Sequence, residues 1–186
     1  LTIEPRSALL KNFVSCYRHG ASRGINIPLV QVTRFSHSEL QPMIKQLWRE
    51  GYQNDDVREL LLETIWTGKF QDCNALLEQA VYDPCIEITD RLVAIKAIAA
   101  TGDSELQQKI VYDVINSPEL WSDKFIFYFA EVSFPQLLSV DDLLILIKRT
   151  NEPKNSTSGF EWALYNVAAE IIPESDAAIL FRDRIT

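Results

Sequence analysis

Residues 56–89 read DVRELLLETIWTGKFQDCNALLEQAVYDPCIEIT, and residues 90–116 read DRLVAIKAIAATGDSELQQKIVYDVIN. In both segments apolar residues at helical spacing lead to a Thr-Gly pair, and a second apolar helix follows. A helical hairpin written twice at a fixed interval predicts stacked α-α repeats. The matching positions, thirty-four residues apart, are Asp56 and Asp90, Leu61 and Ile95, Ile65 and Ala99, Thr67 and Thr101, Gly68 and Gly102, Leu76 and Ile110, Leu77 and Val111, Ala80 and Val114, and Val81 and Ile115.

The composition is that of an ordinary globular protein. The chain has 186 residues, of which 47% are hydrophobic and 24% charged, and this excludes a disordered polypeptide. The longest apolar run, residues 125–134, falls short of the ~20 residues that cross a bilayer and contains Glu131. Three cysteines at no metal or disulfide spacing indicate reduced thiols, so we expect a cytoplasmic protein. The chain begins at Leu1 without a signal peptide, and we expect a fragment of a longer protein.

Charge is distributed unevenly along the chain. Eighteen Lys and Arg stand against twenty-six Asp and Glu, and the net charge of −8 disfavours nucleic acid and anionic membranes as partners. The first fifty residues nevertheless hold seven basic and three acidic side chains. We identify Arg18, His19, Arg23 and Arg34 as candidate contacts to a partner. The alternative is that these residues contact the acidic remainder of the chain or a neighbouring domain.

The first third of the chain is less regular than the rest. An apolar stripe predicts a helix over residues 6–18. Two glycines, a proline and a β-branched run predict an extended connector near residues 20–34. A helix over residues 39–50 follows, capped by Ser36 or Ser38. We predict that left-handed caps at helix ends explain the glycines of the chain.

From Asn54 onward the helical pattern is regular. Asn54 is the predicted cap of the first helix of the twin hairpin, and Asp55 and Asp56 fall in its first turn, where the helix dipole favours carboxylates. Further helices are predicted over residues 118–134, 141–149, 160–171 and 173–182, with a polar loop at 151–158.

The second hairpin resembles a HEAT repeat. The residues that carry this resemblance are Asp90 and Arg91 at the start, Ala94, Ile95, Ala97 and Ile98 within the first helix, and Gly102 and Asp103 in the turn. The resemblance is clear over about two hairpins and looser elsewhere. It implies an all-α fold, an α-solenoid of about five stacked hairpins wound as a right-handed superhelix. We predict one helical-repeat domain over residues 1–186, less regular at 1–53 and HEAT-like at 54–186.

A second resemblance rests on residues 40–73. The residues that carry it are Leu47 and Trp48, Gly51 and Tyr52, Asn54, Val57 and Arg58, Leu60 to Leu62, Ile65, and Gly68 and Lys69. This run is similar to the helical arm that follows the NTPase module in bacterial NACHT or STAND-type proteins, some of which sense phage proteins. No residue of a nucleotide site lies in the chain, so the resemblance implies the sensor half.

No motif for catalysis, cofactor binding or metal binding is present. Cys16 and His19 are spaced as half of a metal site, but only His37, Cys73 and Cys85 remain to complete it, and zinc needs three or four converging ligands. No serine or cysteine has the setting of an activated nucleophile. We therefore predict no enzymatic activity, no cofactor and no metal for this chain.

The expected function is that of a non-enzymatic protein-binding, scaffold or sensor segment of a larger intracellular protein. If the NACHT resemblance holds, that protein carries an NTPase module elsewhere and acts in anti-phage defence. The alternative is a HEAT-like nucleic-acid-binding repeat protein related to DNA glycosylases, which the net acidity disfavours. We expect a protein partner or neighbouring domains as ligands, no membrane contact, and self-association through exposed solenoid ends.

Overall fold

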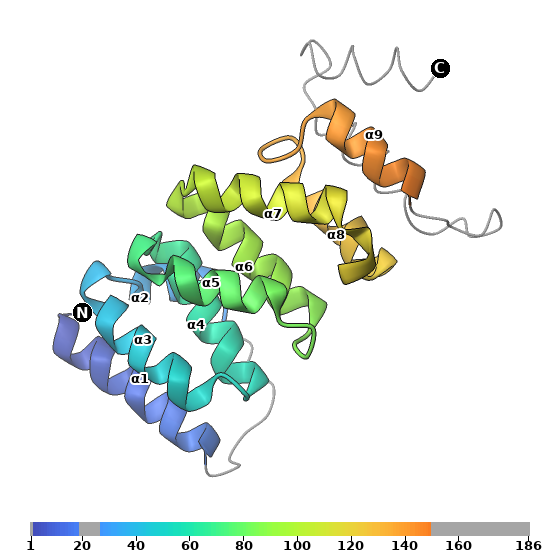
Figure 1. Cartoon of the computed structure of the whole chain (residues 1–186). Coiled ribbons are helices and arrows are strands. Elements are labelled where there is room, and N and C mark those ends of the chain that lie inside the picture. The colour runs from blue at the N-terminus through green and yellow to red at the C-terminus, as the bar shows by residue number, and fades with distance from the viewer. Residues whose placement is uncertain (1, 19–26, 150–186) are drawn as a thin grey trace. The chain divides into compact units, whose positions relative to one another are not determined.

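The computed structural model describes residues 2–18 and 27–149, and every regular element in these ranges is a helix (Figure 1). The two ranges hold nine α-helices, three short 3-10 helices and no strand, which confirms the predicted all-α class. The loop predicted at 151–158 and the helices predicted after it lie outside the described residues.

The chain divides into two compact units, Leu1–Leu106 and Gln107–Thr186. The first unit contains α1 (Ile3–Arg18), α2 (Leu29–Phe35), η1 (Ser38–Leu40), α3 (Gln41–Gly51), α4 (Asp55–Gly68), η2 (Gln71–Cys73), α5 (Asn74–Tyr82) and α6 (Ile88–Thr101). Helix α7 (Ser104–Asn116) begins in the first unit and continues into the second. The described part of the second unit also contains η3 (Pro118–Leu120), α8 (Asp123–Ser133) and α9 (Val140–Arg149).

The prediction of an extended connector near 20–34 is wrong over its last residues, because these form α2. Pro28 precedes this helix with φ −56° and ψ 133°, and its missing N–H costs nothing at a helix start. Val32 is only 1% exposed, and its burial outweighs the preference of β-branched residues for strands. Residues 19–26 lie outside the described part. The helix predicted over residues 39–50 begins with η1, and its cap is not Ser36 or Ser38. There the Glu39 N–H donates to His37 Nδ1 at 3.4 Å.

The start of α4 confirms the predicted cap. Asn54 Oδ1 accepts the Val57 N–H at 3.0 Å, and Asp55 and Asp56 occupy the first turn. One face of the helix is then fully buried in the unit. Its buried apolar residues are Val57, Leu60, Leu61, Leu62 and Ile65.

Close packing, and not a left-handed backbone, explains two glycines for which we predicted caps. A Cβ at Gly51 would lie 2.5 Å from Val57 Cγ1, and one at Gly68 would lie 2.1 Å from the ring of Phe70. The left-handed residue that ends α4 is Lys69, with φ 52°. Gly102, with φ 76°, does end α6 in the predicted way.

Helix α4 contacts four other helices of the first unit, α1, α2, α3 and α6. Helix α5 contacts α6, and α1 contacts both α3 and α4. These contacts bury a continuous apolar core, which explains why amphipathic helices of only two to four turns are stable here. Its members include Leu40, Ile44, Trp48, Leu61, Ile65, Leu77 and Ile95.

In the second unit, a turn divides the single helix that we predicted over residues 118–134. The Ser122 hydroxyl accepts the Phe125 N–H at 3.2 Å, and this cap starts α8 at Asp123 after the short η3. The apolar face of α8 is buried through Phe125, Ile126 and Phe129, and α8 contacts α9. Because a capping serine offers the backbone an alternative to helix, the break has a local cause.

Candidate functional site: an apolar pocket beside a basic rim

A pocket of about 360 Å³ opens in the first unit between α1, α2 and α4. This volume falls in the range of ligand-binding pockets, ~300–1,000 Å³. Most of the lining is apolar. Leu10 and Val32 are buried, whereas Leu9 at the edge is 54% exposed. The apolar lining includes Leu9, Leu10, Phe13, Val32, Phe35 and Leu60.

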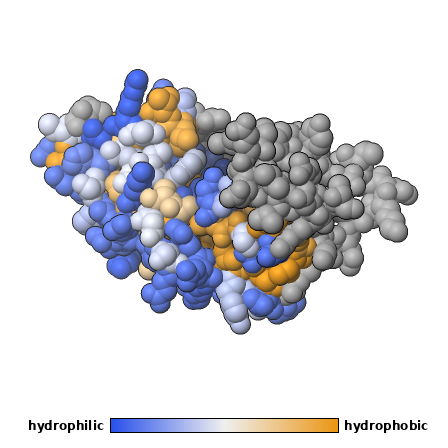
Figure 2. All heavy atoms as spheres, turned by 90° about the horizontal axis from the view of Figure 1, so that it is seen from above, coloured by the Kyte–Doolittle hydropathy of each residue, from blue (hydrophilic) through white to orange (hydrophobic). Residues whose placement is uncertain are grey.

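Two polar side chains complete the pocket wall, Gln31 and Arg34 of α2. Arg34 is the charged member of the lining, and its side chain is exposed. Leu29 and Val30, in the first turn of α2, precede Gln31 in the sequence and are 39% and 59% exposed. Figure 2 shows one face of the molecule, on which the described surface is largely hydrophilic and hydrophobic residues gather in a few areas.

The guanidinium of Arg6 ties α2 to α1 and so helps to define the pocket. Its Nη1 atom donates to three backbone carbonyls at the end of α2: Arg34 at 3.0 Å, Ser36 at 3.2 Å, and Phe35 between them. A cation at a helix C-terminus satisfies carbonyls that have no partner in the helix and interacts favourably with the helix dipole. Arg6 therefore has a structural role.

The structure places only part of the predicted basic cluster. Arg34 lies at the pocket, as stated above. Arg18 is the last residue of α1, and its side chain lies outside the described residues, as do His19 and Arg23 entirely. The role of the four residues as partner contacts stays a prediction.

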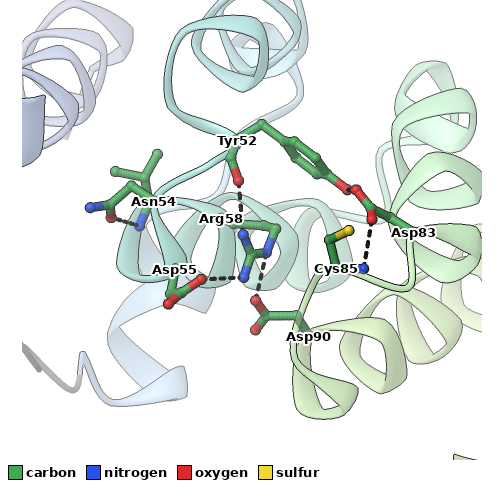
Figure 3. A network of polar contacts seen from close by, with 8 residues as sticks. Tyr52, Asn54, Asp55, Arg58, Asp83, Cys85 and Asp90 are labelled. Carbon is green, nitrogen blue, oxygen red and sulfur yellow. Dashed lines mark hydrogen bonds and ion pairs between the residues drawn. The ribbon is translucent and has the colours of Figure 1, made fainter.

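A second polar cluster lies deep inside the first unit, around Arg58 of α4 (Figure 3). Arg58 is 2% exposed and uses three different nitrogens. Nε donates to Asp90 at 2.7 Å, Nη1 to the carbonyl of Tyr52 at 2.9 Å, and Nη2 to Asp55 at 2.6 Å. The Asp55 side chain is 79% exposed, whereas that of Asp90 is 8% exposed. The buried ion pair is therefore the one with Asp90.

The pKa shifts in this cluster follow from burial and charge. Burial opposes the charge of Arg58, but the hydrogen bonds and charges of Asp55 and Asp90 outweigh it and raise the pKa of Arg58. Burial raises the pKa of Asp90, and the charge of Arg58 offsets this only in part. A buried arginine that is bonded to two carboxylates, one buried and one exposed, is expected to stay charged. Its ion pair with Asp90 is expected to hold α4 and α6 in register.

A neighbouring contact joins Tyr52, at the end of α3, to Asp83, at the end of α5. The Tyr52 hydroxyl donates to Asp83 Oδ2 at 2.6 Å, and the backbone N–H of Cys85 donates to Oδ1 at 2.8 Å (Figure 3). These two bonds lower the pKa of the Asp83 carboxyl, while burial and the same carboxylate raise the pKa of Tyr52. The contact fixes two helix ends and leaves no free acid or base.

The cysteines and histidines form no metal cluster within residues 2–18 and 27–149. No group of three or more metal-ligating side chains converges there. Cys16 and Cys85 are exposed, whereas Cys73 is buried. Cys73 belongs to the core, and its burial raises the pKa of the thiol to about 11. No helix in the same ranges is long and apolar enough to span a membrane.

A comparison with protein-family models gave no match, and comparisons with curated proteins and with solved structures gave none either.

Sequence reasoning missed the pocket, because its lining comes from three helices that are separate in the sequence. The signal that could have indicated it was weak: Leu9 and Leu10 both fall on the apolar stripe of one helix, and the exposure of Leu9 is seen only in the folded chain. An exposed leucine is common on proteins and by itself indicates no binding site.

Proposed function

We propose that this chain is a HEAT-like α-solenoid, wound as a right-handed superhelix, that binds other proteins as a scaffold or sensor segment of a larger intracellular protein. The observation that carries the proposal is that several hydrogen bonds within the first unit join residues at similar sequence separations. These bonds join residues 28 to 32 positions apart, close to the 34-residue repeat of the sequence.

Five bonds illustrate this separation. Ser36 and Thr67 are joined through their hydroxyls at 2.6 Å, and Trp48 Nε1 donates to Gln79 at 3.0 Å. The others are Tyr52 to Asp83, Arg58 to Asp90, and Gln71 to the carbonyl of Thr101. In a globular bundle, contacts join helices at many different separations. In a repeat array each hairpin contacts the next one, and this supports the stacked arrangement.

The helix contacts of the first unit fit the same arrangement. If α2 and α3 form one hairpin, α4 and α5 the next, and α6 begins the third, the first helices contact in the order α2, α4, α6. The sequence suggested no hairpin at α2 and α3, because we predicted residues 20–34 as extended. In this proposal α2 and α3 form a hairpin that precedes the twin hairpin of residues 56–116.

Protein binding fits the surface of the first unit better than nucleic-acid binding. The chain is acidic overall, and polyanions are repelled by an acidic surface. The open pocket beside α2 is mainly apolar, with Arg34 as its charged group. Apolar pockets with a polar rim are the usual centre of protein interfaces. The sensor half of a NACHT or STAND-type protein is the more specific form of this proposal and rests on the resemblance of residues 40–73.

Peptide display and a gel shift together test the function. The immobilised chain is screened against a random peptide library, and the same preparation is titrated with duplex and single-stranded DNA at low and physiological salt. We expect enrichment of peptides that bind at micromolar concentrations and no DNA binding at physiological salt. Failure to enrich any peptide, together with salt-sensitive DNA binding that is lost on replacing Arg18, Arg23 and Arg34, would overturn the proposal in favour of the nucleic-acid alternative.

A further inference from the structure

We propose that the pocket between α1, α2 and α4 is the docking site for an apolar anchor side chain of a partner protein, and that acidic residues flank this anchor. The inference rests on the proposed protein-binding function and specifies where and what the chain binds. Three observations carry it: the shape and lining of the pocket, the charge at its edge, and the apolar surface beside it.

The lining selects an apolar anchor. The floor is formed by Leu10 and Val32, which are 2% and 1% exposed, and Phe13 and Phe35 lie in the wall. A polar ligand would lose its hydration on entering such a space and find few hydrogen-bond partners. A leucine, phenylalanine or tryptophan side chain gains by burial, about 1.5 to 3 kcal/mol for a large apolar side chain.

The edge of the pocket selects the charge of the residues next to the anchor. Arg34 is the charged lining residue, and its side chain makes no ion pair within the described part of the chain. Acids outnumber bases on α4, but α1 and α2 carry Arg6, Lys11 and Arg34 among their described side chains against a single acid, Glu4. In an otherwise acidic protein this local excess of positive charge complements a carboxylate at the rim.

The surface next to the pocket favours a polypeptide over a small amphipathic molecule. Leu9 lines the pocket and is 54% exposed, and Leu29 and Val30, which precede the lining residue Gln31 on α2, are 39% and 59% exposed. A small molecule such as a fatty acid would fill the pocket and leave this surface in water. A peptide chain that inserts one side chain would also cover the surrounding apolar residues, as interfaces with a central anchor do.

Fluorescence polarisation with synthetic peptides tests the inference on the full chain. The first probe is a short fluorescein-labelled peptide with a central Phe-Leu pair between glutamates. In the second the glutamates are lysines, and in the third the Phe-Leu pair is Ala-Ala. We expect the first to bind and each of the others to bind at least about tenfold more weakly. The binding weakens as salt rises, because the rim charges are exposed to solvent.

Variants then locate the binding. Leu9→Asp and Arg34→Glu change exposed side chains at the rim, so both should fold, which far-UV circular dichroism checks. Each should weaken the first peptide at least about tenfold. The matched controls are Tyr112→Asp, an apolar residue that is 66% exposed in the other unit, and Arg49→Glu, an exposed cation on α3, and both should bind like the unchanged chain.

Each remaining outcome overturns the inference. Peptide binding that survives Leu9→Asp and Arg34→Glu would place the partner elsewhere and leave the proposed protein-binding function standing. Preference for the lysine peptide would contradict the charge argument. Binding of dodecanoate but of no peptide would identify a pocket for small amphipathic molecules. Self-association lost in the same two variants, seen by sedimentation, would identify a second copy of this chain as the occupant.

Discussion

The buried ion pair of Arg58 and Asp90 gives the sharpest prediction about stability. It joins α4 to α6, at 2.7 Å, and its side chains are 2% and 8% exposed. Asp90→Ala leaves the arginine charge in the interior with the exposed Asp55 as its remaining carboxylate and the Tyr52 carbonyl as a neutral acceptor. Removing one member of a buried pair costs about 3 to 5 kcal/mol, because the other charge is left without compensation. We expect a loss of that size in the free energy of unfolding, measured by urea denaturation at about pH 7.

The control and the double variant separate the pair from general damage. Asp55→Ala removes the other carboxylate of Arg58, which is 79% exposed, and should cost less than about 1 kcal/mol. Arg58→Met combined with Asp90→Leu replaces both charges by apolar groups and should recover most of the loss, since buried pairs are often no better than hydrophobic packing. Additive losses in the cycle of Arg58→Met, Asp90→Leu and the double variant would show that the two side chains do not interact.

The pH dependence of Arg58→Met has a defined sign. Burial already raises the pKa of Asp90, and losing the arginine charge raises it further. A carboxyl whose pKa is higher in the folded than in the unfolded chain contributes stability below its unfolded pKa, about 3.9, and loses it as the pH rises through the folded pKa. The deficit of Arg58→Met should therefore be smallest near about pH 4 and grow toward neutrality. A deficit that does not change with pH would refute this reasoning.

Three smaller predictions concern single sites. Tyr52→Phe removes the hydrogen bond to Asp83 and should lower the free energy of unfolding by about 1 to 2 kcal/mol. Because that bond lowers the pKa of Asp83, the difference from the unchanged chain should be smaller below about pH 4. Gly102 and Lys69 both have positive φ, which favours glycine. Gly102→Ala should therefore lower the free energy of unfolding by about 1 kcal/mol, and Lys69→Gly should raise it by about 0.5 to 1 kcal/mol. Melting temperatures equal to that of the unchanged chain would contradict this. In the folded chain at about pH 8, Cys73 should resist iodoacetamide while the two exposed cysteines react, as mass spectrometry can determine.

Local signals in the sequence were sufficient to predict most helix ends. Asn54 before two aspartates predicts a helix start, and Gly102 between two apolar helices predicts a stop, because both act through the backbone of their own segment. The helices of residues 55–116 were predictable for the same reason. Their apolar positions recur at helical spacing, and such positions are buried in the structure, as Leu61 and Ile95 are.

Features that depend on distant residues were not predictable. Val32 belongs to a β-branched run that favours strand, and only its burial against the rest of the unit makes α2 a helix. Gly51 and Gly68 resemble helix caps in the sequence, but their lack of a side chain serves close approaches of Val57 and Phe70. Arg58 resembles a surface residue of α4, and its three partners become visible only in the folded chain.

The account depends most on the stacking of α2, α4 and α6 in that order. Spin labels at the exposed residues Thr33, Glu59 and Thr89, in a background without native cysteines, report the three distances between these helices by EPR. Neighbouring packed helices lie about 8 to 10 Å apart, so we predict two short distances and an α2–α6 distance of roughly twice that length. Three similar distances would mean a closed bundle and would contradict the repeat arrangement.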